Sequence, residues 1–148
     1  MPTEVGEFED TKEALQYFQR MYLPDLQELK RRLLFVQAAN GDAVETICSW
    51  WDYTGQRRDP SVHWLAVRQA FQGLGLGRAL VSECLNRLVL LEGHREVFLH
   101  TQTWSHKAIA LYLKTGFEIV QSETFGGYKN DYDKAMPILR ESIPLLLS

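Results

Sequence analysis

The chain has 148 residues, of which 45% are hydrophobic and 24% charged, and its formal net charge is −3. This length suits one domain, residues 1–148, and the balance of apolar and charged residues is typical of a globular protein rather than a disordered one. A chain with a net negative charge lacks the broad positive field of nucleic-acid-binding proteins, so we expect no nucleic-acid partner.

Cysteine content and apolar runs exclude several further classes. Cys48 and Cys84 are too few for a disulfide framework, and no cysteine or histidine spacing fits a metal site, so we expect no metal. Residues 1–10 are acidic and lack the apolar core of a signal peptide, and the longest apolar runs are too short to cross a bilayer. We therefore predict a cytoplasmic protein with no membrane partner.

The N-terminal half is predicted to form two helices and then a strand hairpin. Apolar residues at helical spacing indicate helices over residues 11–22 and 25–32, and the turn sequence Asn40-Gly41-Asp42 separates two strands, residues 33–39 and 43–53. Alternation along the second strand places one set of side chains on each face, with Val44, Thr46, Cys48 and Trp50 opposite Glu45, Ile47, Ser49 and Trp51.

The second half alternates strands and helices. Residues 54–61 are polar and contain Gly55 and Pro60, which predicts a loop. We then expect a strand at 62–67, a helix at 76–92 ended by Gly93, a strand at 96–102, a helix at 105–115 and a strand at 117–125. The tail at 135–142 has the pattern of a strand, although Pro137 would confine it to an edge or a bulge. The fold class is mixed α/β.

A glycine-rich stretch, "QGLGLG" at residues 72–77, lies between a predicted strand and a predicted helix. Such a turn points unpaired backbone N–H groups outward at the positive end of the helix dipole, which favours a phosphate. A nucleotide P-loop requires Lys and then Ser or Thr after its last glycine, whereas Arg78 and Ala79 follow Gly77. The dinucleotide-binding fingerprint requires the spacing G-x-G-x-x-G, whereas these glycines have the spacing G-x-G-x-G. The remaining alternative is a tight turn whose glycines only permit close helix packing.

Two segments together resemble one family. Residues 72–77 match Q/R-x-x-G-x-G/A, the acetyl-CoA pyrophosphate loop of the GNAT superfamily of N-acetyltransferases. "AIALYLKTGF", at residues 108–117, is similar to that family's later helix-to-strand signature, about thirty residues downstream. The resemblance implies a mostly antiparallel sheet flanked by helices, with a V-shaped splay between central strands. Residues 1–10 do not look like the family's first strand, so that strand is missing or degenerate.

The resemblance also implies which residues bind acetyl-CoA as cosubstrate. The loop backbone would hold the pyrophosphate, main-chain groups at the end of the preceding strand would pair with the pantetheine arm, and the later helix would contact the same arm. These positions are Leu65, Ala66, Val67, Gln72, Gly73, Leu74, Gly75, Leu76, Gly77, Arg78, Ser105, Ala108 and Tyr112. Ser105 stands where the family often has asparagine, which puts one contact in question.

Acetylation of an amine needs a base to deprotonate the attacking nitrogen and an acid to protonate the leaving thiolate. Tyr112 occupies the family's tyrosine position beside the CoA sulfur and is the predicted acid, with a core tyrosine as the alternative. His63, on the strand bordering the thioester, is the predicted base, since imidazole titrates near neutral pH; the alternative is a partly buried structural histidine. His100 and His106 are interpreted as strand-end or surface residues, with a position lining the cleft as the alternative.

The resulting prediction is an acetyltransferase that moves an acetyl group from acetyl-CoA to a primary amine of a small molecule, peptide or protein by direct attack. The alternative is a non-catalytic acyl-CoA-binding sensor or interaction module of the same fold. Trp50, Trp51, Tyr53 and Trp104 are candidates for an acceptor site or for core packing. Both a monomer and a homodimer are compatible with the sequence.

Overall fold

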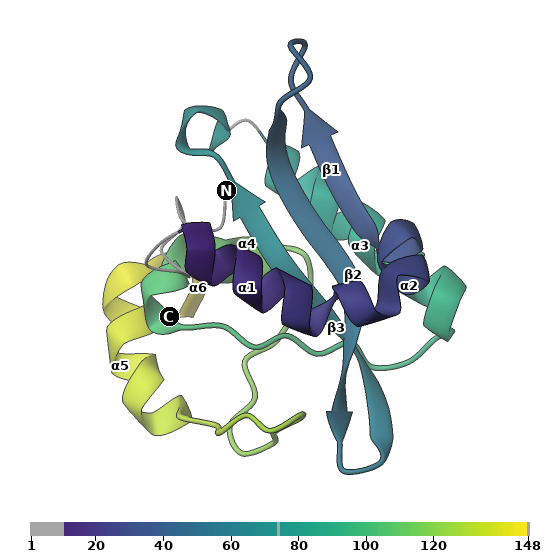
Figure 1. The fold of residues 1–148 in the computed structure, drawn as a ribbon. Coiled ribbons are helices and arrows are strands. Elements are labelled where there is room, and N and C mark those ends of the chain that lie inside the picture. Colours follow the sequence, from purple (N-terminus) through teal and green to yellow (C-terminus); the bar gives the residue numbers. More distant parts are fainter. Residues whose placement is uncertain (1–10, 74, 148) are drawn as a thin grey trace.

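The computed structural model describes residues 11–73 and 75–147. In these residues three strands form one antiparallel sheet and helices pack on both of its faces (Figure 1). The longer elements are α1 (Thr11–Met21), α2 (Leu26–Arg32), β1 (Leu33–Gln37), β2 (Ala43–Thr54), β3 (Arg57–Val67), α3 (Leu76–Glu92), α4 (His106–Lys114) and α5 (Tyr132–Ser142). Short helical turns are η1 (Leu23–Asp25), η2 (Gln69–Phe71), η3 (Thr103–Ser105) and α6 (Pro144–Leu147). None of the described helices combines the length and apolarity needed to cross a bilayer.

The sheet has the strand order β1-β2-β3, with β2 in the centre. Its first hairpin turns at Gly41, whose φ of 89° is accessible mainly to glycine, and this confirms the predicted turn. A second tight turn at Gly55 joins β2 to β3, so that Arg57 pairs with Thr54 and Pro60 with Trp51. The loop predicted for residues 54–61 is therefore wrong, because most of that segment continues the two strands.

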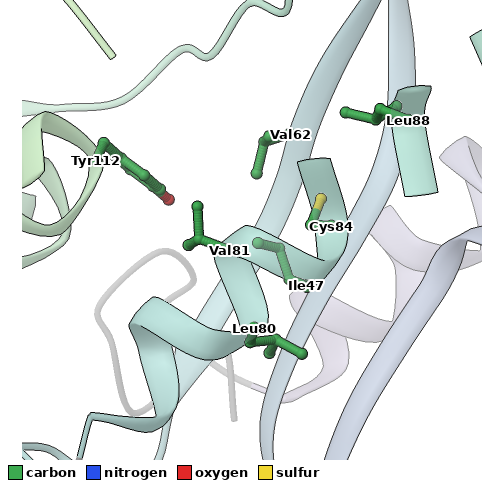
Figure 2. Close-up of a cluster of buried hydrophobic side chains, with 7 residues drawn as sticks. All are labelled: Ile47, Val62, Leu80, Val81, Cys84, Leu88 and Tyr112. Atoms are coloured by element: carbon green, nitrogen blue, oxygen red, sulfur yellow. The ribbon is translucent and has the colours of Figure 1, made fainter. Parts of the chain in front are cut away.

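The predicted alternation along β2 is confirmed for Ile47, Cys48 and Trp50 by two separate cores, but it is wrong for Trp51, which stacks on Trp50 and packs on the same face. On one face, Cys48 and Trp50 pack with Tyr22 and Leu29 beneath α1 and α2. On the other face, Ile47 packs against α3, whose buried stripe is Leu80, Val81, Cys84 and Leu88. Figure 2 shows this second core, in which Tyr112 points from α4 toward Val81. The sheet thus separates an aromatic layer from an aliphatic one.

Two predicted strands are not regular strands in the structure. Residues 96–102 contribute one parallel bridge, Ser61 to Phe98, and residues 117–125 pair with no strand among the described residues. The bridge uses two backbone bonds, from Val62 N to Phe98 O at 3.1 Å and from Phe98 N to Pro60 O at 2.9 Å. Beyond Phe98 the two segments part, which opens one side of β3.

The C-terminal segment is helical, which contradicts the predicted strand over residues 135–142. Pro137 lies inside α5, in the second turn of this helix, where its missing N–H removes one hydrogen bond but the helix continues to Ser142. Met136 and Leu139 are buried and pack against Ile109 of α4. The tail therefore covers α4 rather than extending the sheet.

Candidate functional site

A cavity of about 970 Å³ lies between β3, the chain segment 99–102, the start of α3 and helix α4. The cavity opens at the point where β3 separates from the segment that follows Phe98. The backbone groups of Leu65 and Val67 therefore face the cavity, and among the described residues no strand pairs with them on the cavity side. This is the V-shaped opening expected between the two segments. An extended chain can pair with an exposed strand edge of this kind through main-chain hydrogen bonds.

A bulge in β3 borders this opening. Thr46 pairs with Ala66 and Cys48 with His63, so that two residues of β3 lie opposite one residue of β2. Trp64 in this bulge has a φ of 61°, the left-handed region that bulky residues rarely adopt, and its carbonyl accepts a hydrogen bond from Thr46 Oγ1 at 3.0 Å. The bulge turns the strand toward the cavity, and residues in such sparsely populated conformations occur often at functional sites.

The glycine-rich turn joins β3 to α3 at the other end of the cavity. Gly73 and Gly75 have φ values of 80° and 79°, and a Cβ at either position would meet no heavy atom within 4 Å. Gly75 precedes α3 without any side-chain cap, so the first N–H groups of this helix lack intrahelical partners. These two glycines therefore shape an open turn whose N–H groups suit an anion, and the residues present fit the pyrophosphate of CoA.

Gly77 serves a different purpose. A Cβ there would lie 2.9 Å from Leu111 Cδ2 and 3.4 Å from Glu45 Oε1, so this glycine permits the close packing of α3 on α4 and β2. Glu45 is fully buried behind the turn, and neither of its carboxylate oxygens has a hydrogen-bond partner among the described residues. Burial accordingly raises the pKa of the Glu45 carboxyl to about 7.

The predicted base, His63, is held at both ring nitrogens. Nε2 lies 2.8 Å from Asp52 Oδ2 and 2.9 Å from Ser61 Oγ, and the Ser61 hydroxyl donates to the same Asp52 oxygen at 2.8 Å. Nδ1 lies 2.8 Å from the Tyr22 hydroxyl. A carboxylate only accepts hydrogen bonds, so in the neutral ring Nε2 carries the hydrogen and Nδ1 accepts one from Tyr22.

Tyr128 extends this network to the far side of the cavity. Its hydroxyl is hydrogen-bonded to Asp52, and burial, with the nearby Asp52 charge, raises its pKa to about 12. The Tyr128 ring stacks on His100 with the ring centroids 3.9 Å apart. Burial lowers the pKa of His100, which favours the neutral imidazole. His100 and His106 both line the cavity, which is the alternative position that the sequence left open for them.

The predicted acid, Tyr112, lies in the cavity wall on α4 and is 8% exposed. Its ring meets Phe117 edge-on, with centroids 5.7 Å apart, and packs in the aliphatic core under α3. Ser105 and Ala108, at the start of the same helix, also line the cavity. The family-like signature therefore places three predicted cofactor contacts on one side of the opening.

Most residues of the predicted acetyl-CoA site line this one cavity. Beside those described above, Gln72, Leu76 and Arg78 do so, and the Gln72 side-chain amide donates to Val67 O at 3.2 Å. Ala66 does not, because it is buried within the sheet at 2% exposure. Leu74 lies outside the described residues. Among the described residues no group of three or more potential ligands could hold a metal ion.

The sequence interpretation missed Tyr22, Asp52, Ser61 and Tyr128. Alternation along paired strands could have placed Asp52, Ser61 and His63 on one face, but Tyr22 and Tyr128 come from outside the sheet. Of the four aromatic candidates for an acceptor site, Trp104 lines the cavity. Trp50 is in the core beneath α1, Trp51 is stacked between Trp50 and the Arg58 guanidinium, and Tyr53 is exposed.

Comparison with known proteins identifies the family of the chain. The model of the acetyltransferase (GNAT) family matches residues 4–117. An N-alpha-acetyltransferase 50 from Danio rerio is 26% identical over 98 residues, which are 66% of this chain and 55% of that protein. An uncharacterized protein from Mycobacterium leprae is 40% identical over 57 residues, which are 38% of this chain and 15% of that protein. The chain thus spans about half or less of the length of these relatives.

Solved structures share the fold. A GNAT-family acetyltransferase from Streptococcus pneumoniae has a TM-score of 0.50 at 24% identity, covering 64% of this chain and 56% of its own. A spermidine N-acetyltransferase chimera from Vibrio cholerae has a TM-score of 0.53 at 19% identity, covering 74% and 63%. The glucosamine-6-phosphate N-acetyltransferase of Arabidopsis thaliana has a TM-score of 0.53 at 16% identity, covering 78% of each chain. Because the family model matches most of the chain, this protein belongs to the GNAT family of acetyltransferases.

Proposed function

We propose that the chain is an acetyl-CoA-dependent N-acetyltransferase acting on a primary amine of a small molecule, peptide or protein. One observation carries this proposal: the glycine turn, the exposed edge of β3, Tyr112 and the His63 network all line one continuous cavity. A family fold alone would support acetyl transfer in general. The shared cavity additionally provides candidate proton-transfer groups next to a fitting acetyl-CoA site.

The cofactor site would use mainly backbone groups. The N–H groups at the start of α3 and the turn at Gly73 and Gly75 would hold the pyrophosphate, and the edge at Leu65 and Val67 would pair with the pantetheine arm. Arg78, Ser105 and Ala108 would add contacts from the cavity wall. When bound, acetyl-CoA supplies the acetyl group and a thiolate leaving group.

His63 would act as the base through Tyr22. In the neutral ring the Nδ1 lone pair faces the Tyr22 hydroxyl, so Tyr22 can pass its proton to His63 as its oxygen takes one from the amine. Asp52 would hold the ring in the required tautomer and stabilise the imidazolium that forms. Tyr112 would donate a proton to the leaving thiolate from α4.

The test is release of free thiol from acetyl-CoA in the presence of a panel of primary amines and N-terminal peptides. We expect turnover with at least one class, and stabilisation of the chain against heat by acetyl-CoA and CoA. Stabilisation by NAD or ATP alone would contradict the acetyl-CoA site. Stabilisation by acetyl-CoA without transfer to any amine would favour the sensor or interaction module.

A further inference from the structure

The charged side chains along the cavity wall are separated by sign. Among the described lining residues the lysines and arginines are Arg78 on α3 and Lys107 and Lys114 on α4. The same lining contains one carboxylate, Asp52 on β2. The cations therefore belong to α3, which follows the glycine turn, and to α4, whereas the negative charge belongs to the sheet and is hydrogen-bonded to His63.

Aromatic residues are connected to this carboxylate directly or through His63. The Tyr22 hydroxyl is hydrogen-bonded to His63, and His63 is hydrogen-bonded to Asp52. Tyr128 is hydrogen-bonded to Asp52 directly. Trp64 meets Tyr22 edge-on at 5.5 Å between centroids and stacks on Tyr17 at 5.9 Å. These four aromatic residues and Asp52, which we call the acceptor end, all line the cavity. Such a surface combines a negative charge with the negative faces of aromatic rings.

One of these rings already attracts a cation. The guanidinium carbon of Arg20 lies 5.7 Å from the centroid of Tyr17, although Arg20 itself is not part of the cavity lining. A positive group next to aromatic faces and a carboxylate is stabilised by both, and more so where water is excluded. A negative group at the same place is repelled by Asp52, whereas the lysines and arginines of the described cavity lining lie on α3 and α4.

We propose that the acceptor end selects an amine whose ammonium is its only charge, carried on an apolar or aromatic body, and rejects an amine with a carboxylate or phosphate nearby. This inference rests on the proposed function, since it names the acceptor class of that reaction. A free amino acid is excluded by its carboxylate, whereas an arylalkylamine and a peptide with an apolar N-terminal residue share the favoured chemistry.

The experiment compares three compounds that share one aromatic body: phenethylamine, phenylalanine amide and phenylalanine. Binding to the full chain is measured by isothermal titration without acetyl-CoA, so the result does not depend on acetyl transfer. We expect phenethylamine and phenylalanine amide to bind about tenfold or more tightly than phenylalanine. Equal binding of the three, tighter binding of phenylalanine, or no binding of any of them would overturn the inference.

Transfer assays then separate this inference from the proposed function. Acetyl transfer to phenethylamine and to a peptide amide beginning with phenylalanine is measured with acetyl-CoA, and the ratio of their kcat/KM values identifies a small amine or a peptide as the source. Selective binding without any transfer would uphold the acceptor class and overturn the proposed function. A higher kcat/KM for glucosamine 6-phosphate or free phenylalanine than for phenethylamine would uphold the proposed acetyltransferase function and overturn the proposed acceptor class.

Two variants test the residues that carry the proposal. In the Asp52→Asn variant we expect the dissociation constants of phenylalanine and phenylalanine amide to differ by no more than about twofold, because the charge that repels the carboxylate is removed. Tyr17→Leu is expected to weaken phenethylamine by about fivefold. The matched controls are Asp133→Asn, at an exposed position of α5, and Tyr53→Leu, at an exposed position of β2, which should leave both affinities unchanged. Equal effects of test and control variants would contradict the assignment.

Discussion

The Nε2 atom of His63 lies 2.8 Å from Oδ2 of Asp52, and both side chains line the cavity that contains the glycine turn. A carboxylate in this position fixes the hydrogen on Nε2 and leaves Nδ1 as an acceptor, which faces the Tyr22 hydroxyl. The proton path that we propose therefore depends on a residue that acts through His63. This dependence can be measured.

Asp52→Asn is expected to lower kcat/KM by about 100-fold, because an amide NH₂ facing Nε2 favours the opposite tautomer and removes the acceptor at Nδ1. The KM for acetyl-CoA should stay within about twofold, since Asp52 lies outside the predicted cofactor contacts. Steady-state kinetics with Asp133→Asn as control give the comparison. A kcat/KM within a factor of two of the unmodified chain would refute the positioning role.

The base itself is tested by the pH dependence of kcat/KM. His63→Ala is expected to remove the acidic limb of the pH-rate profile, whereas His100→Ala should leave that limb in place. His100 is the appropriate comparison because it lines the same cavity and stacks on Tyr128. Loss of the limb in His100→Ala alone would move the base to His100.

Tyr112→Phe removes the predicted proton donor while keeping the ring that packs against Phe117. We expect kcat to fall by about 100-fold with little change in melting temperature, because the buried ring is retained. Steady-state kinetics and thermal unfolding measure the two effects, with Tyr53→Phe as an exposed control. A near-normal kcat would show that Tyr112 is a core residue only.

Gly77→Ala is expected to destabilise the chain by at most about 1 kcal/mol: the new methyl group would lie 2.9 Å from Leu111 Cδ2, which is the end of a side chain that can move, and alanine favours a helix more than glycine does. The double variant with Leu111→Ala relieves this contact, so the two substitutions should couple favourably in a double-mutant cycle. Urea unfolding provides the four free energies. Gly75→Ala is the contrast: its φ of 79° predicts backbone strain of ~1–2 kcal/mol that Leu111→Ala cannot relieve.

The Glu45 carboxyl predicts a pH-dependent stability. Burial raises its pKa from 4.5 to about 7, so the folded chain retains a proton that the unfolded chain loses near pH 4.5. The stabilisation is complete below about pH 4.5 and is lost as the pH rises through about 7. Urea unfolding between pH 5 and 8 should show that the free energy of unfolding of the unmodified chain falls relative to that of Glu45→Gln.

The expected difference between these two chains changes by on the order of 2–3 kcal/mol across this range. Comparing the chains with each other removes the contribution of groups such as Asp59, whose pKa is lowered by hydrogen bonds from Arg57 and Thr54. Parallel stability curves for the two chains would mean that the Glu45 carboxyl titrates in the folded state as it does in the unfolded state.

The sequence by itself determined the helices before residue 115, the first hairpin and the glycine turn. Helix α3 and the two faces of β2 follow from local periodicity, and Gly41 is required by a tight turn. The glycine turn and Tyr112 follow from motif spacing. In each case the signal lies within a few residues of the feature, so no long-range contact is needed to read it.

Only the tertiary structure decided the acceptor end. Tyr22, Asp52 and Tyr128 are far apart in the chain and meet because the turn after α1, strand β2 and the segment before α5 pack around His63. The helix around Pro137 and the irregular path after Phe98 were likewise set by packing against distant elements. Local patterns carry no information about which distant side chains share a cavity wall, because that depends on how the layers are stacked.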